Sequence, residues 1–172
     1  SYLDKLYRNR FPKDELISKN RIWRVLCEQY FSRYIKPNEV VVDIGAGYCE
    51  FINNIKAGKK IALDLNPDVR KFAKDDVLII NESCDAASSL ADASVDAIFM
   101  SNFLEHLPNK SIVLQTLKEC ARILKPGGRV IILQPNIRFV YDQYWDYFDH
   151  HTALSDRSLT EAVLIAQLDP KV

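Results

Sequence analysis

Three acidic residues follow three successive apolar segments of this chain, and their spacing predicts a site for a nucleoside-containing ligand. The segment 40–44 carries Asp43 and runs into Gly45-Ala46-Gly47, where glycines allow a sharp turn and a close approach of the backbone to a ligand. Asp64 ends the next segment about 20 residues later, where a carboxylate can accept hydrogen bonds from both ribose hydroxyls. Asp85 follows the third segment, where it could accept a hydrogen bond from the adenine amine.

The glycine loop distinguishes between two adenosyl ligands. A dinucleotide fingerprint has the form G-x-G-x-x-G, but here Gly45 and Gly47 are followed by Tyr48, Cys49 and Glu50. Asp43 would also repel a pyrophosphate, whereas its charge suits the ammonium group of a methionine moiety. These features favour S-adenosylmethionine over NAD, so that an NAD-dependent oxidoreductase is the weaker interpretation.

The elements that must position these residues follow from hydrophobic periodicity and turn signals. Short apolar segments alternate with amphipathic ones, which predicts a doubly wound, mostly parallel α/β sheet with helices on both faces. Ser155 or Asp156 is expected to cap the last helix. We expect strands at 40–44, 60–65, 77–81, 95–101 and 129–133, and helices at 12–35, 50–55, 112–124 and 157–168.

Four segments of the chain resemble the motifs of class I S-adenosylmethionine-dependent methyltransferases, and they are closest to the small-molecule group known as type 11. VVDIGAG at 41–47 is similar to the first motif and ALDLNP at 62–67 to the ribose-binding motif. SVDAIFMSNFLEHL at 94–107 resembles the fourth-strand motif, and LKPGGRV at 124–130 the approach to the fifth strand. The resemblance covers about residues 40–134.

The resemblance implies S-adenosylmethionine as cofactor, S-adenosylhomocysteine as product and a Rossmann-like fold. Cys49 departs from the family, since a glycine is common at that place, and is expected to narrow the loop. The family sheet normally gains a sixth and a seventh strand, which this chain is expected to lack, so strand 129–133 could form an exposed edge and pair in a homodimer. The implied cofactor-binding residues are Asp43, Gly45, Ala46, Gly47, Asp64, Leu65, Asn66, Cys84, Asp85, Ala86, Asn102 and Phe103.

The acceptor side is expected at the end of the fourth strand and in the aromatic segment that follows the fifth. His106 is a candidate general base, although a histidine bonded to backbone at a helix start is the simpler interpretation. The segment 144–152 resembles one in bacterial methyltransferases of surface-polysaccharide pathways, which favours a sugar-type acceptor. Adjacent histidines cannot easily share one ion, so no metal site is expected. The candidate acceptor-binding residues are Tyr141, Tyr144, Trp145, His150 and His151.

Composition narrows the class of protein further. Lysine plus arginine and aspartate plus glutamate number 23 each, so the zero net charge gives no reason to expect a nucleic-acid partner. The 4 cysteines are scattered, which argues against structural zinc and against a disulfide framework. We expect no membrane span and a cytoplasmic protein.

The 172 residues are expected to form a single domain. It would comprise an N-terminal helical part (1–36), a cofactor-binding core (40–134) and an acceptor-side part (135–172). The predicted function is methyl transfer from S-adenosylmethionine to a small molecule or glycan. The alternative is a catalytically inactive module of the same fold that binds the cofactor or a protein.

Overall fold

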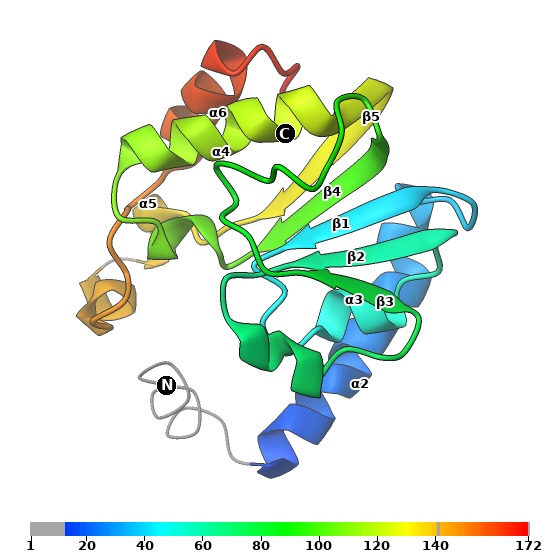
Figure 1. Ribbon diagram of the computed structural model, residues 1–172. Helices are drawn as coiled ribbons and strands as arrows, with labels where there is room; N and C mark the ends of the chain where they lie inside the picture. Colours follow the sequence, from blue (N-terminus) through cyan, green and yellow to red (C-terminus); the bar gives the residue numbers. More distant parts are fainter. Residues whose placement is uncertain (1–12, 141, 172) are drawn as a thin grey trace.

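The computed structural model describes residues 13–140 and 142–171, which form a three-layer α/β domain around a parallel sheet (Figure 1). Its five strands lie in the order β3-β2-β1-β4-β5, and all neighbouring pairs are parallel. This confirms the predicted doubly wound sheet. The strands are β1 (Val40–Ile44), β2 (Lys59–Leu63), β3 (Val77–Ile80), β4 (Val95–Ser101) and β5 (Leu124–Leu133).

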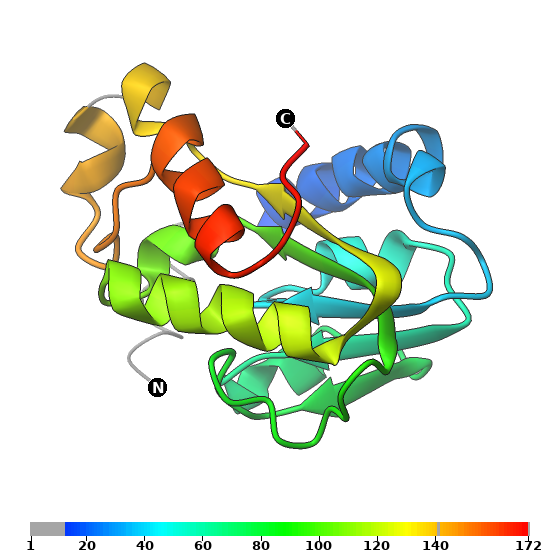
Figure 2. The ribbon, with the colours of Figure 1, turned by 90° about the horizontal axis from the view of Figure 1, so that it is seen from above.

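Helices cover both faces of the sheet (Figure 1, Figure 2). On one face lie α2 (Lys13–Gln29) and α3 (Glu50–Asn54), and on the other α4 (Lys110–Ile123) and α6 (Asp156–Ile165). A short helix, α5 (Ile137–Val140), follows β5 near the carboxyl ends of the strands. The 3-10 turns are η1 (Phe31–Arg33), η2 (Pro67–Lys71), η3 (Leu104–His106) and η4 (Asp142–Asp146).

Alternate residues of the buried strands face opposite sides of the sheet, and each side has its own hydrophobic core. In β1, Val42 and Ile44 belong to the core under α4 and α6, whereas Val41 belongs to the core under α2 and α3. A side-chain period of two places Asp43 on the same face as Val41. The carboxylate therefore lies on the α2–α3 side of the sheet, at the carboxyl end of its strand.

The N-terminal helix departs from the prediction of one helix over 12–35. Helix α2 ends at Gln29, and the separate turn η1 follows it. Of the five apolar residues used for the periodicity, Leu26 and Phe31 pack in the core, but Ile17, Ile22 and Val25 are 58%, 60% and 55% exposed. The face of α2 that carries Leu26 and Cys27 is the one that is buried. It packs on the aromatic core formed with α3 and β4.

The other elements differ from the sequence prediction mainly in where they begin and end. β1 and β4 have the predicted bounds, and Ser155 caps α6 by accepting a hydrogen bond from the Ser158 N–H at 3.2 Å. β5 begins at Leu124 rather than at 129, because Leu124 already pairs with Val95 before a register shift at the Pro-Gly-Gly turn.

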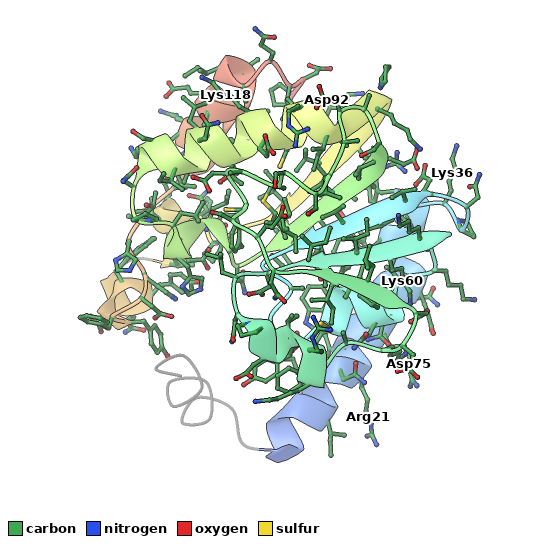
Figure 3. The ribbon with its side chains drawn as sticks, in the orientation of Figure 1. Arg21, Lys36, Lys60, Asp75, Asp92 and Lys118 are labelled. Atoms are coloured by element: carbon green, nitrogen blue, oxygen red, sulfur yellow. The ribbon has the colours of Figure 1, made fainter. Side chains whose placement is uncertain are left out.

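Among the described residues, β3 and β5 are the edge strands of the sheet, and pairing of a second copy along β5 stays a prediction. Within the described ranges, no helix is long and apolar enough to cross a membrane. Lys36 and Lys60 lie toward the amino ends of the strands, at the end of the sheet opposite α5 (Figure 1, Figure 3). The features described next all lie at the carboxyl end.

Candidate active site

The loop after β1 is built from left-handed backbone conformations. Gly45 and Gly47 have φ of +69° and +51°, and Cys49 has φ of +60° although it is not a glycine. Two hydrogen bonds hold the loop: Gly45 N–H donates to Leu63 O at 2.9 Å, and Cys49 N–H donates to Ala46 O at 2.7 Å. A Cβ atom on Gly45 would lie only 2.2 Å from the Phe103 ring, so the ring packs directly against this glycine.

Asp43 is a buried carboxylate at the start of this loop, and only 4% of its surface is exposed. Burial raises the pKa of Asp43 well above its ordinary range, and the nearby Glu50 and Asp64 carboxylates raise this pKa further. Such an environment disfavours the ionised side chain unless a cation arrives to compensate it. The position is therefore suited to a positively charged group of a ligand.

Asp64 joins the end of β2 to the glycine loop. Its carboxylate accepts hydrogen bonds from the Gly47 N–H at 2.9 Å and from the Asn66 N–H at 2.8 Å. The Asn81 side-chain amide donates to the Asp64 backbone carbonyl at 3.0 Å. These contacts connect the carboxyl ends of β1, β2 and β3. The neighbouring Leu65 side chain is 69% exposed.

A cavity of about 720 Å³ opens beside Asp43 at this edge of the sheet. One wall is the glycine loop with the ends of β4 and β5, a second comes from α2 and α3, and a third comes from the segment after β5. Its lining residues are Lys19, Trp23, Asp43, Gly45, Ala46, Tyr48, Glu50, Phe51, Phe99, Ser101, Asn102, His106, Leu133, Tyr144, Tyr147 and His150. One cavity therefore joins the predicted cofactor loop to the predicted acceptor side.

Aromatic packing and one ion pair form the floor and the α2 side of the cavity. The Phe51 and Phe99 rings stack with centroids 3.6 Å apart, and the Trp23 ring meets Phe99 edge-on at 5.9 Å. The Lys19 ammonium lies 3.1 Å from the Glu50 carboxylate. This arrangement fixes α2 against α3 and places one charged pair next to Asp43.

The acceptor side gathers polar groups from two distant segments. Glu105 is fully buried, and its carboxylate accepts hydrogen bonds from the Tyr144 hydroxyl and from the Gln134 amide, the latter at 2.9 Å. His106 and His150 face each other edge-on with ring centroids 4.9 Å apart. Burial lowers the pKa of His150, which favours its neutral imidazole.

Backbone hydrogen bonds connect these two segments rigidly. The His151 and Thr152 N–H groups both donate to Glu105 O, at 2.7 and 3.0 Å. The Thr152 hydroxyl donates to Leu107 O at 2.6 Å. The turn η3 and the loop 149–152 therefore form one unit, and the position of each histidine depends on the other segment.

The structure brings part of the predicted site into the cavity wall. The predicted residues found there are Asp43, Gly45, Ala46, Asn102, His106, Tyr144 and His150. Cys84 instead lies against Thr116 of α4, with 3.3 Å between its sulfur and the hydroxyl, so its side chain faces the core. Tyr141 lies outside the described residues. The predicted residues outside the wall are Gly47, Asp64, Leu65, Asn66, Cys84, Asp85, Ala86, Phe103, Trp145 and His151.

Sequence reasoning missed the contribution of α2 and α3. Lys19 and Trp23 belong to a helix whose orientation over the sheet no local pattern determines, and Glu50 follows the glycine loop without a motif of its own. Tyr147 lies in the same aromatic segment as the predicted Tyr144, and the high aromatic density there was a usable signal. The unpredicted lining residues are Lys19, Trp23, Tyr48, Glu50, Phe51, Phe99, Ser101, Leu133 and Tyr147.

Comparison with known proteins places the domain. A family model described as a methyltransferase domain matches residues 42–132. A probable methyltransferase of Aspergillus luteorubrus is 30% identical over 112 residues, which cover 55% of this chain and 39% of the relative. A demethylmenaquinone methyltransferase of Corynebacterium glutamicum is 27% identical over 136 residues, covering 73% of this chain and 56% of the relative. This chain thus spans about half the length of the curated relatives it matches.

Solved structures agree on the fold. A methyltransferase from Archaeoglobus fulgidus superposes with a TM-score of 0.72 at 22% identity, over 86% of this chain and 68% of the other. A geranyl diphosphate methyltransferase in complex with S-adenosylmethionine gives a TM-score of 0.70 at 17% identity, over 89% and 66%. The family model, the parallel sheet and the glycine loop agree, and the chain belongs to the class I methyltransferases, whose cofactor is S-adenosylmethionine.

Proposed function

We propose that this chain transfers a methyl group from S-adenosylmethionine to a small-molecule acceptor. The observation that carries the proposal is the single cavity of about 720 Å³ shared by the glycine loop and the aromatic, histidine-containing segment. Ligand sites of about 300–1,000 Å³ are typical for small molecules. Sites at the carboxyl ends of parallel strands are the usual ligand positions in open α/β sheets.

The residues present fit the cofactor. Asp43 offers a buried carboxylate in the cavity wall for the methionine ammonium, where a charge-assisted hydrogen bond is strong. The Gly45 and Gly47 backbone admits a ligand without a Cβ in the way. Asp64 already accepts two backbone N–H groups, but each carboxylate oxygen has two lone pairs, so ribose hydroxyls can still be bound.

The acceptor side favours a ring-containing or sugar-type small molecule. Tyr144, Tyr147 and Trp23 all line the cavity, and aromatic faces of this kind stack on planar rings and on the apolar faces of sugars. One relative of this chain is named a demethylmenaquinone methyltransferase, and one structural neighbour acts on geranyl diphosphate. Both names describe small-molecule acceptors, in keeping with the size of the cavity.

Methyl transfer depends mainly on holding the acceptor in line with the methyl group of the cofactor. When bound, S-adenosylmethionine supplies an electrophilic methyl group on its sulfonium. Asp43 and the glycine loop hold that end of the site in place, while the tyrosines orient the acceptor in line with it. His106 keeps a nitrogen lone pair available on the acceptor side, because its other nitrogen, Nδ1, lies 2.9 Å from Asp149 O. That lone pair can accept a proton or bind a cation.

Calorimetric titration with three ligands tests the cofactor part of the proposal. We expect S-adenosylhomocysteine to bind the chain and NAD not to bind. Methylthioadenosine lacks the amino-acid group, so it separates the role of Asp43 from that of the adenosyl site. Asp43→Asn should weaken S-adenosylhomocysteine by about 10- to 100-fold, the value of one charged hydrogen bond, and leave methylthioadenosine unchanged. Equal losses for both ligands would contradict the assignment of Asp43.

Turnover separates an enzyme from a module that only binds the cofactor. The chain is incubated with methyl-labelled S-adenosylmethionine and either an ultrafiltered metabolite extract or the retained macromolecules. Label is expected in the small-molecule fraction, and less of it with Asp43→Asn. Label confined to macromolecules would exclude a small-molecule acceptor, and cofactor binding with no transfer to either fraction would favour the inactive module.

A further inference from the structure

Three side chains with metal-binding atoms converge on the acceptor side of the cavity. Glu105, His106 and His150 each offer one ligand atom, and these atoms all lie within 4.8 Å of one another. Both histidines also line the cavity. The set joins the end of β4 to the segment after β5, so it exists only in the folded chain.

Both imidazoles are held in the tautomer that a metal ligand needs. His106 Nδ1 lies 2.9 Å from Asp149 O, and His150 Nδ1 lies 2.7 Å from Tyr144 O. A carbonyl oxygen only accepts hydrogen bonds, so each Nδ1 must carry the hydrogen. Each Nε2 then keeps its lone pair, and a backbone carbonyl fixes the ring orientation. Such outer contacts accompany metal-bound histidines in most known sites.

Glu105 is a buried acid whose known side-chain hydrogen-bond donors are uncharged. It is 0% exposed, and its carboxylate accepts hydrogen bonds from the Tyr144 hydroxyl and the Gln134 amide, which are both neutral groups. In the ranges 13–140 and 142–171, no lysine or arginine forms an ion pair with it. Burying an ionised carboxylate is unfavourable unless it is paired or bound to a metal. A cation beside Glu105 would remove that cost.

The neighbours of the cluster leave two polar atoms unsatisfied. Gln134 Oε1 and Trp145 Nε1 are buried and have no hydrogen-bond partner among the residues that the structure describes. Gln134 contacts Glu105 through its amide nitrogen, and the Trp145 ring lies 6.0 Å from that of His150. Buried polar atoms of this kind commonly mark a missing water or ion. Water molecules on a bound ion could satisfy them.

We propose that Glu105, His106 and His150 bind a divalent first-row transition metal ion such as Zn²⁺. Two imidazoles and one carboxylate are a ligand set that zinc and related ions prefer, and three protein ligands leave positions open toward the cavity. Ligand atoms in a tetrahedral zinc site lie about 3.5 Å apart, so separations of up to 4.8 Å would have to shorten by up to roughly 1.3 Å. The open positions would take a hydroxyl or carbonyl oxygen of the acceptor, a role that rests on the proposed function.

A single general base would explain less of the arrangement. The geometry of His106 alone fits a base, as the sequence suggested, since one oriented imidazole is sufficient for proton transfer. It does not account for a second imidazole with a similar Nδ1–carbonyl contact, nor for the fully buried carboxylate whose ligand atom lies within 4.8 Å of theirs. The sequence argument against a metal site considered the adjacent histidines His150 and His151. In the folded chain, the His150 ring instead lies beside that of His106.

Metal titration of the full chain tests the site without any acceptor. The protein is treated with a chelator, and Co²⁺ is added while visible absorption is recorded, with Zn²⁺ as competitor. We expect one ion per chain, with visible bands of nitrogen and oxygen ligation that Zn²⁺ removes. His106→Gln and His150→Gln should each weaken binding on the order of 100-fold or more. His151→Ala is the matched control, because this exposed histidine lies beside His150 but outside the cluster.

The outcomes separate this proposal from the proposed function. Circular dichroism and urea unfolding confirm that each variant is folded before its titration is interpreted. Absence of stoichiometric binding, or equal loss in His151→Ala and His150→Gln, would overturn the metal site. S-Adenosylhomocysteine is titrated into the metal-free protein in parallel. Its binding without metal binding leaves the proposed function intact, whereas metal binding without cofactor binding supports the metal site alone.

Discussion

Replacing Gly45 by alanine combines two costs that can be separated by experiment. At φ of +69° an alanine adopts the left-handed region, which costs about 1–2 kcal/mol. Its Cβ would also lie 2.2 Å from Phe103 Cδ2 and 2.8 Å from Cε2 and Cγ. Carbon atoms pack at about 3.5 Å, so the ring must move by more than about 1 Å. Overpacking of that kind adds about 1–3 kcal/mol.

Gly127 provides the matched control for backbone strain. Its φ of +78° is also left-handed, but a Cβ there has no neighbour within 4 Å. It lies in β5 at the end opposite Leu133, which is the residue of that strand in the cavity wall. Gly127→Ala should therefore lose about 1–2 kcal/mol of unfolding free energy, and Gly45→Ala about 2–5 kcal/mol.

Urea unfolding and calorimetric titration measure both consequences. Gly45→Ala should also bind S-adenosylhomocysteine at least about 10-fold more weakly, because Phe103 would be displaced at the cofactor loop. Gly127→Ala should keep the wild-type affinity. Equal stability losses in the two variants, with cofactor affinity unchanged in both, would refute the packing of Phe103 on Gly45 and the role given to this contact.

Three further predictions concern single residues. Cys49 is buried at φ of +60°, so Cys49→Gly should be more stable than Cys49→Ala by about 1 kcal/mol in urea unfolding, the reverse of the usual order. Burial raises the pKa of Asp43, so its ionised form destabilises the fold above its ordinary pKa. Asp43→Asn should therefore raise the melting temperature at neutral pH, and the gain should vanish below about pH 4. The Asp96 carboxylate accepts hydrogen bonds from the Val40 N–H at 2.8 Å and from the Lys125 ammonium at 2.9 Å, and both lower its pKa. The ionised carboxylate therefore stabilises the fold above the ordinary pKa of aspartate, and this stabilisation is lost as the pH falls through the lowered pKa. Asp96→Asn should cost about 1–2 kcal/mol at neutral pH, and a pH series of urea midpoints should show the difference shrinking in acid.

The sheet could be predicted from the sequence because its signals are local. β1 and β4 are continuous apolar runs bounded by turn residues, and both were placed with the observed ends. Helix α2 was harder, since Ile17 and Ile22 suggested an apolar face that the fold leaves exposed. Which stripe of an amphipathic helix is buried depends on the surface it meets, here the aromatic core around Phe99. That surface is assembled from segments far apart in the chain.

The site shows the same division between local and distant information. Asp43, Gly45 and Ala46 lie in the cavity wall as expected, because a loop after a strand carries its own geometry. The cluster of Glu105, His106 and His150 could not be predicted, since two backbone hydrogen bonds to Glu105 O bring its two segments together. No spacing in the sequence encodes that contact. The sequence argument considered the adjacent pair His150 and His151, whereas the fold places the His150 ring beside that of His106.

Two carboxylates are buried near this cavity, Asp43 in its wall and Glu105 behind the lining residues His106 and Tyr144, and neither forms an ion pair in the described part of the chain. The burial that raises the pKa of Asp43 lowers the stability of the ligand-free protein. Each carboxylate lies where a cationic partner is proposed, an ammonium group for Asp43 and a metal ion for Glu105. A ligand that binds only the folded chain stabilises it by mass action. S-Adenosylhomocysteine and Zn²⁺ should therefore each raise the melting temperature. Because the two carboxylates belong to separate proposed contacts, their increments should be close to additive, and Asp43→Asn should reduce only the increment from S-adenosylhomocysteine.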